Sequence, residues 1–293
     1  MLAAALRFSL LVELLIYGLA TSRFLALPAE QAVLAAVCIL LGMRAGIIAT
    51  TYLAAIAHQS PAPQLGVFRA TVMVVAEYLA FLRLFLLIQP FERLWMGADR
   101  LEAGRPVLVL VHGYGCNRGA WWWLRRHFER AGYAVATLNL EPVYTSIDDY
   151  VPLLDARIEA ACREAECAQV TLIGHSMGGL VARAYLAAHG EQRVSLLLSI
   201  ATPHAGSVLA RVGLGTNARQ MEPGSAWLKR LWQQSSATPQ VSLRNSHDNF
   251  VMPQDNQRLP GAADIELSAT GHLAVLFSRQ AAAALLEMLA RRT

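Results

Sequence analysis

The sequence predicts an α/β domain with a mostly parallel sheet of about six strands, preceded by an all-helical apolar region. Two observations carry this prediction. Few charged residues precede position 92 of the 293, whereas nearly all acidic and basic side chains follow it. After residue 105, short runs rich in Val, Ile and Leu alternate with longer amphipathic stretches. Such alternation is typical of βαβ units around a buried parallel sheet.

The composition indicates that part of the chain does not face water. Apolar residues make up 55% of the sequence and charged residues only 16%, against about 25% charged in a typical soluble domain. The net charge of +4 is not gathered into runs of Lys or Arg. We therefore expect no nucleic-acid partner, and at most a mild attraction to anionic lipid.

Three apolar stretches occupy the first third of the chain, at 8–21, 32–57 and 67–88. Each predicts a helix, and the second and third reach the roughly 20 residues that a bilayer-spanning helix needs. We predict that residues 1–95 form a hydrophobic helical membrane anchor with two or three transmembrane spans. The alternative is a helical subdomain packed on the domain that follows.

Ionisable residues interrupt these apolar stretches and weaken the prediction of spans. Glu13, Arg44, Glu77 and Arg83 lie inside them, and a charge at bilayer depth costs a few kcal/mol unless it pairs or reaches the interface. We expect Arg44 and Glu77 to pair between helices. A cleaved export signal is an alternative for the first stretch, but Glu13 interrupts its core and two more apolar stretches follow, so we expect a retained anchor.

The anchor predicts a membrane location, which we expect to be the bacterial inner membrane. With three spans, the flanking arginines favour a cytoplasmic second domain. Loss of one span would reverse this orientation, so the side of the membrane stays open. Arg7 and Arg69 would lie on one face, and Arg23, Arg93, Arg100 and Arg105 on the other.

Residues 96–293 are predicted to form the second domain. Strands are expected at 106–111, 133–140, 169–173, 194–200, 240–244 and 265–268, and helices at 120–131, 147–162, 177–189 and 272–291. No strand pair precedes residue 106, so we expect a sheet trimmed at its start. The segment at about 203–238 lacks strand character and is too long for a plain connection, which predicts a cap or lid.

The strongest motif is Gly174-His175-Ser176-Met177-Gly178-Gly179, directly after the expected strand VTLI and directly before a helix. A sharp strand-to-helix turn exposes the serine hydroxyl, and Gly174 and Gly178 remove the Cβ atoms that would collide there. The helix N-terminus favours an anionic intermediate. We predict that Ser176 is a nucleophile.

A second motif, His112-Gly113-Tyr114-Gly115, follows the strand VLVLV. Its backbone N–H groups would lie at the same edge of the sheet as Ser176. We predict that the amides of Tyr114 and Met177 form an oxyanion hole, a contribution commonly worth about 3 kcal/mol per donor. The alternative for this motif alone is a flexible turn.

A serine nucleophile needs a base, and the base needs an orienting acid. Asp248 follows the fifth expected strand and His272 follows the sixth, so both would lie at the carboxyl edge of the sheet. We assign Asp248 as the acid and His272 as the base. The competing residues are two acids, Asp255 and Asp264, and two histidines, His204 and His247.

Taken together, HGYG, GHSMGG, TPHAGS, SHDNFV and the terminal Gly271-His272 resemble the bacterial lipase branch of the α/β-hydrolase superfamily over about residues 106–291. The resemblance implies carboxylic ester hydrolysis through an acyl-enzyme. The segment 202–207 is similar to the one that leads into the lid of such lipases, which favours lipid esters. The sequence departs from the family pattern in its missing first strands and its hydrophobic front third, and the latter argues against a secreted lipase.

The sequence as a whole predicts a membrane-associated lipase or esterase, with a phospholipase as one specific form. Acyl transfer to an alcohol and a non-catalytic membrane scaffold are the alternatives. We expect a lipid or ester substrate, no cofactor and no metal, because no carboxylate cluster has calcium-loop spacing and the four cysteines form no zinc-type pair. Acyl chain length, head group and oligomeric state are not determined by the sequence.

Overall fold

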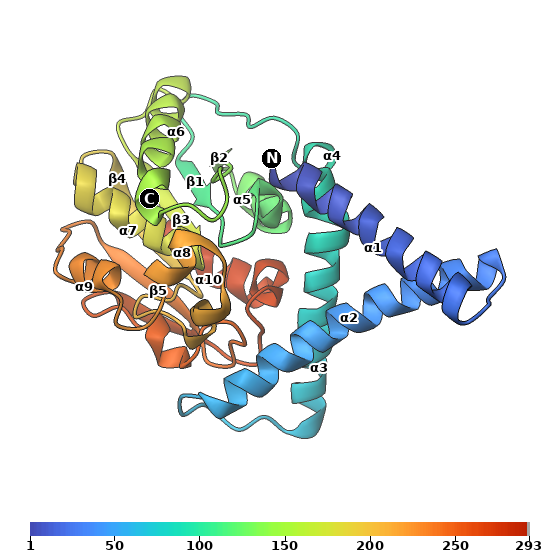
Figure 1. Cartoon of the computed structure of the whole chain (residues 1–293). Coiled ribbons are helices and arrows are strands. Elements are labelled where there is room, and N and C mark those ends of the chain that lie inside the picture. Colours follow the sequence, from blue (N-terminus) through green and yellow to red (C-terminus); the bar gives the residue numbers. More distant parts are fainter. Residues whose placement is uncertain (292–293) are drawn as a thin grey trace.

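A six-stranded, entirely parallel sheet forms the centre of the protein, in the computed structural model that describes residues 1–291 (Figure 1). The strand order is β2-β1-β3-β4-β5-β6, which confirms the predicted sheet. The strands are β1 (Val107–Val111), β2 (Ala134–Thr137), β3 (Val170–His175), β4 (Val194–Ile200), β5 (Gln240–Asn245) and β6 (Ala263–Leu267).

Apolar side chains on both faces of the sheet explain the two helical layers. In β1, Val109 and Val111 belong to one buried cluster, and Leu108 and Leu110 belong to the other, because successive side chains of a strand point to opposite faces. The first cluster is covered by α6 (Val151–Glu164) and α7 (Met177–His189). The second is covered by α5 (Trp122–Arg130) and α10 (Arg279–Ala290).

Local details differ from the prediction, most clearly in the second strand and in the last helix. The second strand is shorter than expected, ending at Thr137. The helix predicted at 272–291 is divided into a 3-10 turn, η7 (Ala274–Phe277), and α10. The division falls at Ser278, whose side chain accepts a hydrogen bond from the Ala281 N–H and so starts a new helix.

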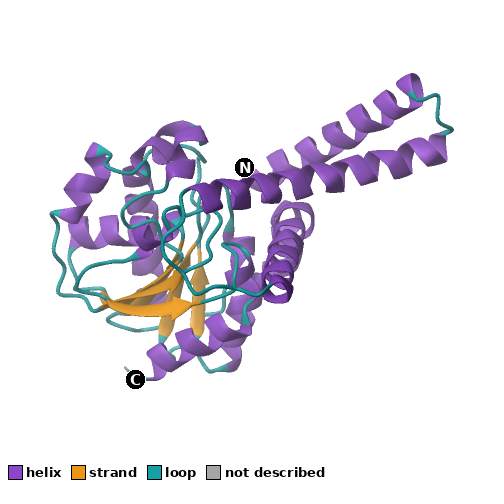
Figure 2. Ribbon diagram, turned by 90° about the horizontal axis from the view of Figure 1, so that it is seen from below, coloured by secondary structure: helices purple, strands orange, loops and turns teal. Residues whose placement is uncertain are grey.

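The N-terminal third contains three helices that are long and apolar enough to cross a membrane. α1 (Leu2–Phe24) and α2 (Ala29–Ala57) form an antiparallel hairpin that projects from the body of the protein (Figure 2). α3 (Val67–Leu82) continues through a π-helical turn, η1 (Arg83–Ile88), and a 3-10 turn, η2 (Gln89–Phe91), into α4 (Glu92–Met96). The hairpin is apolar and exposed around its tip, with Phe24 87% exposed.

α3 and η1 are docked on the sheet domain, although they precede the predicted boundary at residue 95. Ala80 and Leu84 are buried in the same apolar cluster as Leu108 and Leu110 of β1. Further along, Gln89 binds the backbone N–H of Asn117 through its side chain, at 2.8 Å. The apolar core therefore extends across that boundary.

The predicted ion pair between Arg44 and Glu77 is wrong. Arg44 instead binds Glu13 through its two terminal guanidinium nitrogens, at 2.5 and 2.9 Å, because these two residues face each other within the hairpin. Glu77 faces the sheet domain, where it accepts backbone hydrogen bonds from Leu273 and Ala274. The bidentate pair neutralises both charges inside the apolar hairpin.

Candidate active site

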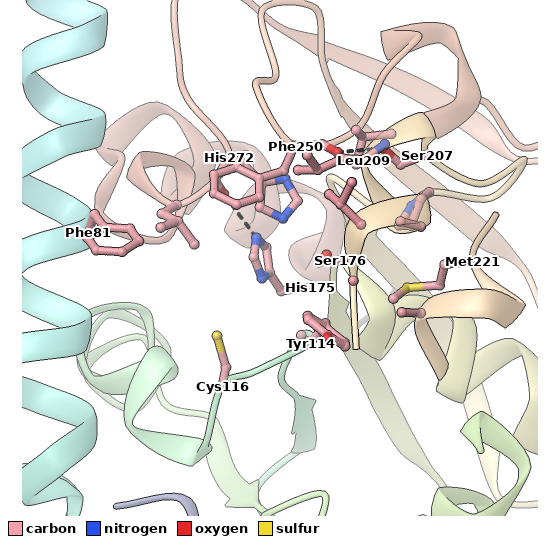
Figure 3. A pocket seen from close by; sticks show the side chains of 18 of the residues that line it. Phe81, Tyr114, Cys116, His175, Ser176, Ser207, Leu209, Met221, Phe250 and His272 are labelled. Carbon is pink, nitrogen blue, oxygen red and sulfur yellow. Dashed lines mark hydrogen bonds between the residues drawn. The ribbon is translucent and has the colours of Figure 1, made fainter. Parts of the chain in front are cut away.

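Ser176 lies at the turn between β3 and α7, in a backbone conformation that few residues adopt. Its φ is 54° and its ψ is −126°, a strained region that costs on the order of 1–3 kcal/mol for a residue with a side chain. The Ser176 N–H donates to the Ile200 carbonyl of β4 at 2.8 Å. The turn is therefore held by the neighbouring strand, and the side chain lines a cavity of about 220 Å³ (Figure 3).

Glycines around Ser176 are required by close backbone packing. A Cβ on Gly174 would lie 2.5 Å from the Gly179 nitrogen, and one on Gly178 would overlap the Val111 carbonyl of β1. Gly179, which was not among the predicted site residues, is equally constrained, because a Cβ there would overlap the Thr202 side chain. The strand-to-helix turn thus has no room for larger residues.

Asp248 and His272 are brought together from the loops after β5 and β6. The Asp248 Oδ2 is 2.8 Å from the His272 Nδ1, while Oδ1 accepts the backbone N–H groups of Phe250 and Val251, each at 2.7 Å. Asp248 is fully buried. Because a carboxylate only accepts hydrogen bonds, Nδ1 carries the proton and the lone pair of the neutral ring lies on Nε2, as a general base requires.

The electrostatic surroundings of His272 favour its protonated form. Burial lowers the pKa of His272, but the charge and hydrogen bond of Asp248, with a further contribution from the charge of Glu77, outweigh burial and raise the pKa above its ordinary value. An imidazolium that forms during the reaction is therefore stabilised where it forms.

Ser176 and His272 line the same cavity, and Figure 3 shows Ser176 between the His272 ring and Tyr114. Among residues 1–291 the Ser176 hydroxyl makes no hydrogen bond. Hydrogen bonds between a nucleophile and its base are commonly loose without substrate. The structure therefore places the three predicted residues around one site, with the Asp248–His272 contact formed.

The predicted oxyanion loop is fixed by His112. Its Nε2 accepts the Leu140 N–H at 3.0 Å, and its Nδ1 lies 3.0 Å from the Gly113 carbonyl. Burial lowers the pKa of His112 to about 4, so the ring stays neutral. Within the described residues, the backbone N–H groups of Tyr114 and Met177 have no acceptor. Both are therefore free to donate a hydrogen bond, as the predicted oxyanion hole requires.

The four competing residues lie outside the cavity lining. Asp255 and Asp264 pair with an arginine side chain at 2.8 and 2.7 Å. His204 is fully buried against the Ser199 hydroxyl, at 3.0 Å, and burial lowers its pKa well below the ordinary value. His247 lies 3.0 Å from a backbone carbonyl of the loop between α2 and α3.

The structure adds site residues that the sequence did not reveal. The His175 Nε2 contacts the His272 carbonyl at 3.0 Å, and the Asn249 Oδ1 accepts the His272 N–H at 3.1 Å. His175 precedes Ser176 in the motif GHSMGG, and Asn249 follows Asp248 in SHDNFV. Their position beside the predicted catalytic residues was therefore a usable signal. Phe81 and Phe85, from α3 and η1, line the cavity, but nothing local in the sequence connects them with His272.

The segment between β4 and β5 covers another side of the cavity. It contains η5 (Val208–Val212), α8 (Gly215–Gln220) and α9 (Ala226–Trp232), and Leu209, Val212 and Met221 are among its lining residues. The Tyr114 hydroxyl donates to the Leu214 carbonyl and accepts the Leu214 N–H, both at 2.8 Å. The segment is thus tied to the loop that offers the free Tyr114 amide.

Comparison with known proteins agrees with this geometry. Residues 106–235 match the family described as alpha/beta hydrolase fold. A triacylglycerol lipase from Burkholderia plantarii is 33% identical over 125 residues, covering 39% of this chain and 34% of that protein. A triacylglycerol lipase from Pseudarthrobacter phenanthrenivorans is 33% identical over 123 residues, covering 39% and 38%. This chain thus spans about a third of the length of these relatives.

The fold is shared with solved lipase structures. Mature lipase BlEst2 from Bacillus licheniformis superposes with a TM-score of 0.57 at 17% identity, covering 67% of this chain and 96% of that one. The sheet domain is therefore an α/β-hydrolase fold, as the sequence motifs predicted. The family match covers the motif-bearing segment 106–235.

Proposed function

We propose that this protein is a membrane-bound serine hydrolase that cleaves carboxylic esters of lipids through an acyl-enzyme. The observation that carries the proposal is the convergence of a strained Ser176 and a hydrogen-bonded Asp248–His272 pair on one apolar cavity. The names of the triacylglycerol lipases that are 33% identical over 125 and 123 residues support the same chemistry.

The proposed reaction runs in two halves. The Ser176 Oγ attacks the ester carbonyl while the His272 Nε2 takes its proton, and the Tyr114 and Met177 amides hold the oxyanion. Collapse expels the alcohol, which receives the proton from His272. Water then attacks the acyl-enzyme and gives a proton to His272, and His272 returns that proton to the departing Ser176 Oγ as the acid is released.

An apolar lining favours a lipid acyl group over a small soluble ester. Phe81 and Phe85 form one wall of the cavity, and Leu209, Val212 and Met221 form another. Burial of a hydrocarbon chain against such walls contributes about 0.8 kcal/mol per methylene. Long acyl chains should therefore be bound more tightly than acetyl groups.

The proposal includes a membrane-inserted hairpin. α1 and α2 project beyond the domain with an apolar tip, whereas α3 lies along the domain between the sheet and the projecting end of the hairpin (Figure 1). This arrangement supports entry of the hairpin into the bilayer, with α3 at the bilayer surface. Two helices, not three, would then enter the membrane, and the wall with Phe81 and Phe85 would face arriving lipid.

The test uses the full-length protein in detergent or lipid, with Ser176→Ala as control. We expect a fluorophosphonate probe to label the wild-type protein at Ser176 and not the variant. We also expect hydrolysis of p-nitrophenyl esters and of lipid esters that the variant lacks. Equal activity of the two proteins would contradict the proposal, and formation of a new ester when an alcohol is added would identify an acyltransferase.

A further inference from the structure

Glu77 on α3 contacts the chain on both sides of His272. Its carboxylate accepts the Leu273 N–H at 3.0 Å through both oxygens and the Ala274 N–H at 2.7 Å. On the other side, a Cβ on Gly271 would lie 2.6 Å from the carboxyl carbon of Glu77. The turn that carries His272 is therefore packed around one carboxylate from a helix almost 200 residues away.

These contacts are strong because Glu77 is completely buried. Burial raises the pKa of Glu77 to about 7, against the lowering effect of these two hydrogen bonds. When the carboxyl group is ionised, hydrogen bonds to it are roughly twice as strong as those between neutral groups. Removing the carboxylate would leave two buried N–H groups without an acceptor, at a cost of about 1–3 kcal/mol each. The backbone directly after His272 therefore has little freedom to move while Glu77 is in place.

A second side chain completes the support of this turn. The His272 N–H donates to the Asn249 Oδ1 at 3.1 Å, and the Asn249 Nδ2 donates to the Thr51 hydroxyl of α2 at 2.8 Å. Three successive backbone N–H groups, from His272 to Ala274, are thus bound by side chains. The anchor helices reach all three, through Glu77 directly and through Thr51 by way of Asn249.

We propose that Glu77 is a positioning residue for the reaction, which holds the turn 271–274 so that the His272 ring keeps its contact with Asp248 and its Nε2 directed to Ser176. The inference rests on the proposed function, because it assigns Glu77 to the same site. Among the described residues Glu77 has no cationic partner, since Arg44 is paired with Glu13. When Glu77 is ionised, its charge also acts on His272, together with the charge of Asp248.

The charge and the reach of Glu77 can be separated by two substitutions. Glu77→Gln keeps the length but removes the charge, and Glu77→Asp keeps the charge but shortens the side chain. Tyr78→Phe is the matched control, because Tyr78 is the next residue of α3 and its hydroxyl donates to the Leu41 carbonyl of α2. All variants are measured as full-length protein, with kcat expressed per Ser176 labelled by fluorophosphonate.

We expect both Glu77 variants to lower kcat roughly tenfold or more, because a displacement of about 1 Å at a catalytic group can lower the rate about a hundredfold. The two should differ in their pH profiles. In Glu77→Gln the acidic limb of kcat/KM moves to lower pH, because the charge of Glu77 helps to raise the pKa of His272. In Glu77→Asp the limb stays near that of the wild type, and Tyr78→Phe changes neither kcat nor the limb.

The inference would be overturned if Glu77→Gln had the kcat per labelled site of the wild type and the same acidic limb in its pH profile. Equal changes in Glu77→Gln and Tyr78→Phe would also overturn it, because they would indicate general damage to helix packing. If Glu77→Gln does not fold, a wild-type kcat in Glu77→Asp overturns it instead. A wild-type protein that hydrolyses no ester overturns both proposals, whereas an active one with unaffected Glu77 variants overturns this one alone.

Discussion

His272 determines how the proposed activity depends on pH. A general base works only when its ring is neutral, and the raised pKa of His272 keeps the ring protonated up to a higher pH than an ordinary histidine. The rate should therefore be lost as the pH falls through the pKa of the folded protein, which lies above the ordinary value of 6.5. The site should therefore work best at pH values above the raised pKa of His272.

Replacing Asp248 with Asn should both slow the reaction and shift the acidic limb of its pH profile. Without the carboxylate, the His272 pKa falls because burial is no longer outweighed, and the Nδ1–H tautomer loses its partner. We expect kcat/KM to fall on the order of 10³ to 10⁴-fold, with an acidic limb at lower pH. Steady-state kinetics from pH 5 to 9 measure both the rate and the acidic limb, and Asp255→Asn is the surface control. An unshifted acidic limb in Asp248→Asn would argue against the role of Asp248 as the acid that orients His272.

At the residue level, sequence analysis identified the residues that lie within motifs. Ser176, Asp248 and His272 follow expected strands, so the rule that parallel strands share a carboxyl edge brings them to one place. Glu77 and Phe85 lie on a helix that the same analysis assigned to a membrane anchor. Helix packing of this kind depends on three-dimensional fit between distant segments, and the sequence offers no periodic signal for it.

The Tyr114 hydroxyl makes two hydrogen bonds with Leu214, which connect the segment between β4 and β5 to the loop that carries the Tyr114 amide. Elsewhere the segment is fixed to the domain, for example by Trp227, whose indole N–H donates to Asp148 at 2.8 Å. The connection near the cavity is therefore a point at which substrate entry can be altered without disturbing the whole segment.

Tyr114→Phe should loosen this segment while leaving the backbone amide in place. The variant loses two hydrogen bonds, each worth about 1 kcal/mol. We expect faster proteolytic cleavage near Leu214 and a change in kcat of only a few fold. Limited proteolysis followed by mass spectrometry measures the first, and a cleavage rate equal to that of the wild type would show that the hydroxyl does not restrain the segment.

The first four strands were predictable because each contains a short apolar run, and the positions of α6 and α7 followed from the longer stretches between the strands. The break at Ser278 was not predictable, because no Gly or Pro marks it and only the side-chain cap starts the new helix. Packing of α3 on the sheet domain was expected only as the alternative to a membrane span. A mostly apolar helix satisfies a bilayer and a protein core equally well, so composition alone does not choose between them.

At the scale of the whole molecule, the exposed apolar tip of the hairpin is the proposed membrane contact. Leu25 is 64% exposed and lies in the loop between α1 and α2. A charge there would cost a few kcal/mol inside the bilayer. We expect Leu25→Asp to reduce co-flotation with phospholipid vesicles at least tenfold, while hydrolysis of a soluble p-nitrophenyl ester is retained.

Leu153→Asp is the matched control, because Leu153 is a 39% exposed leucine on α6 of the sheet domain. It should leave flotation unchanged. Full vesicle binding by the Leu25 variant would mean that the hairpin tip does not enter the membrane.

The burial of Ala80 and Leu84 against β1 decides how this protein can be prepared for study. A version that starts at the predicted boundary would lose Ala80 and Leu84 from the apolar cluster that contains Leu108 and Leu110, and would lose Phe81 and Phe85 from the lining of the cavity. Such a product should aggregate, since apolar surface exposed to solvent costs about 25 cal/mol per Å². A water-soluble version is better sought by replacing the outward-facing apolar residues of the first two helices with polar ones, and keeping every helix.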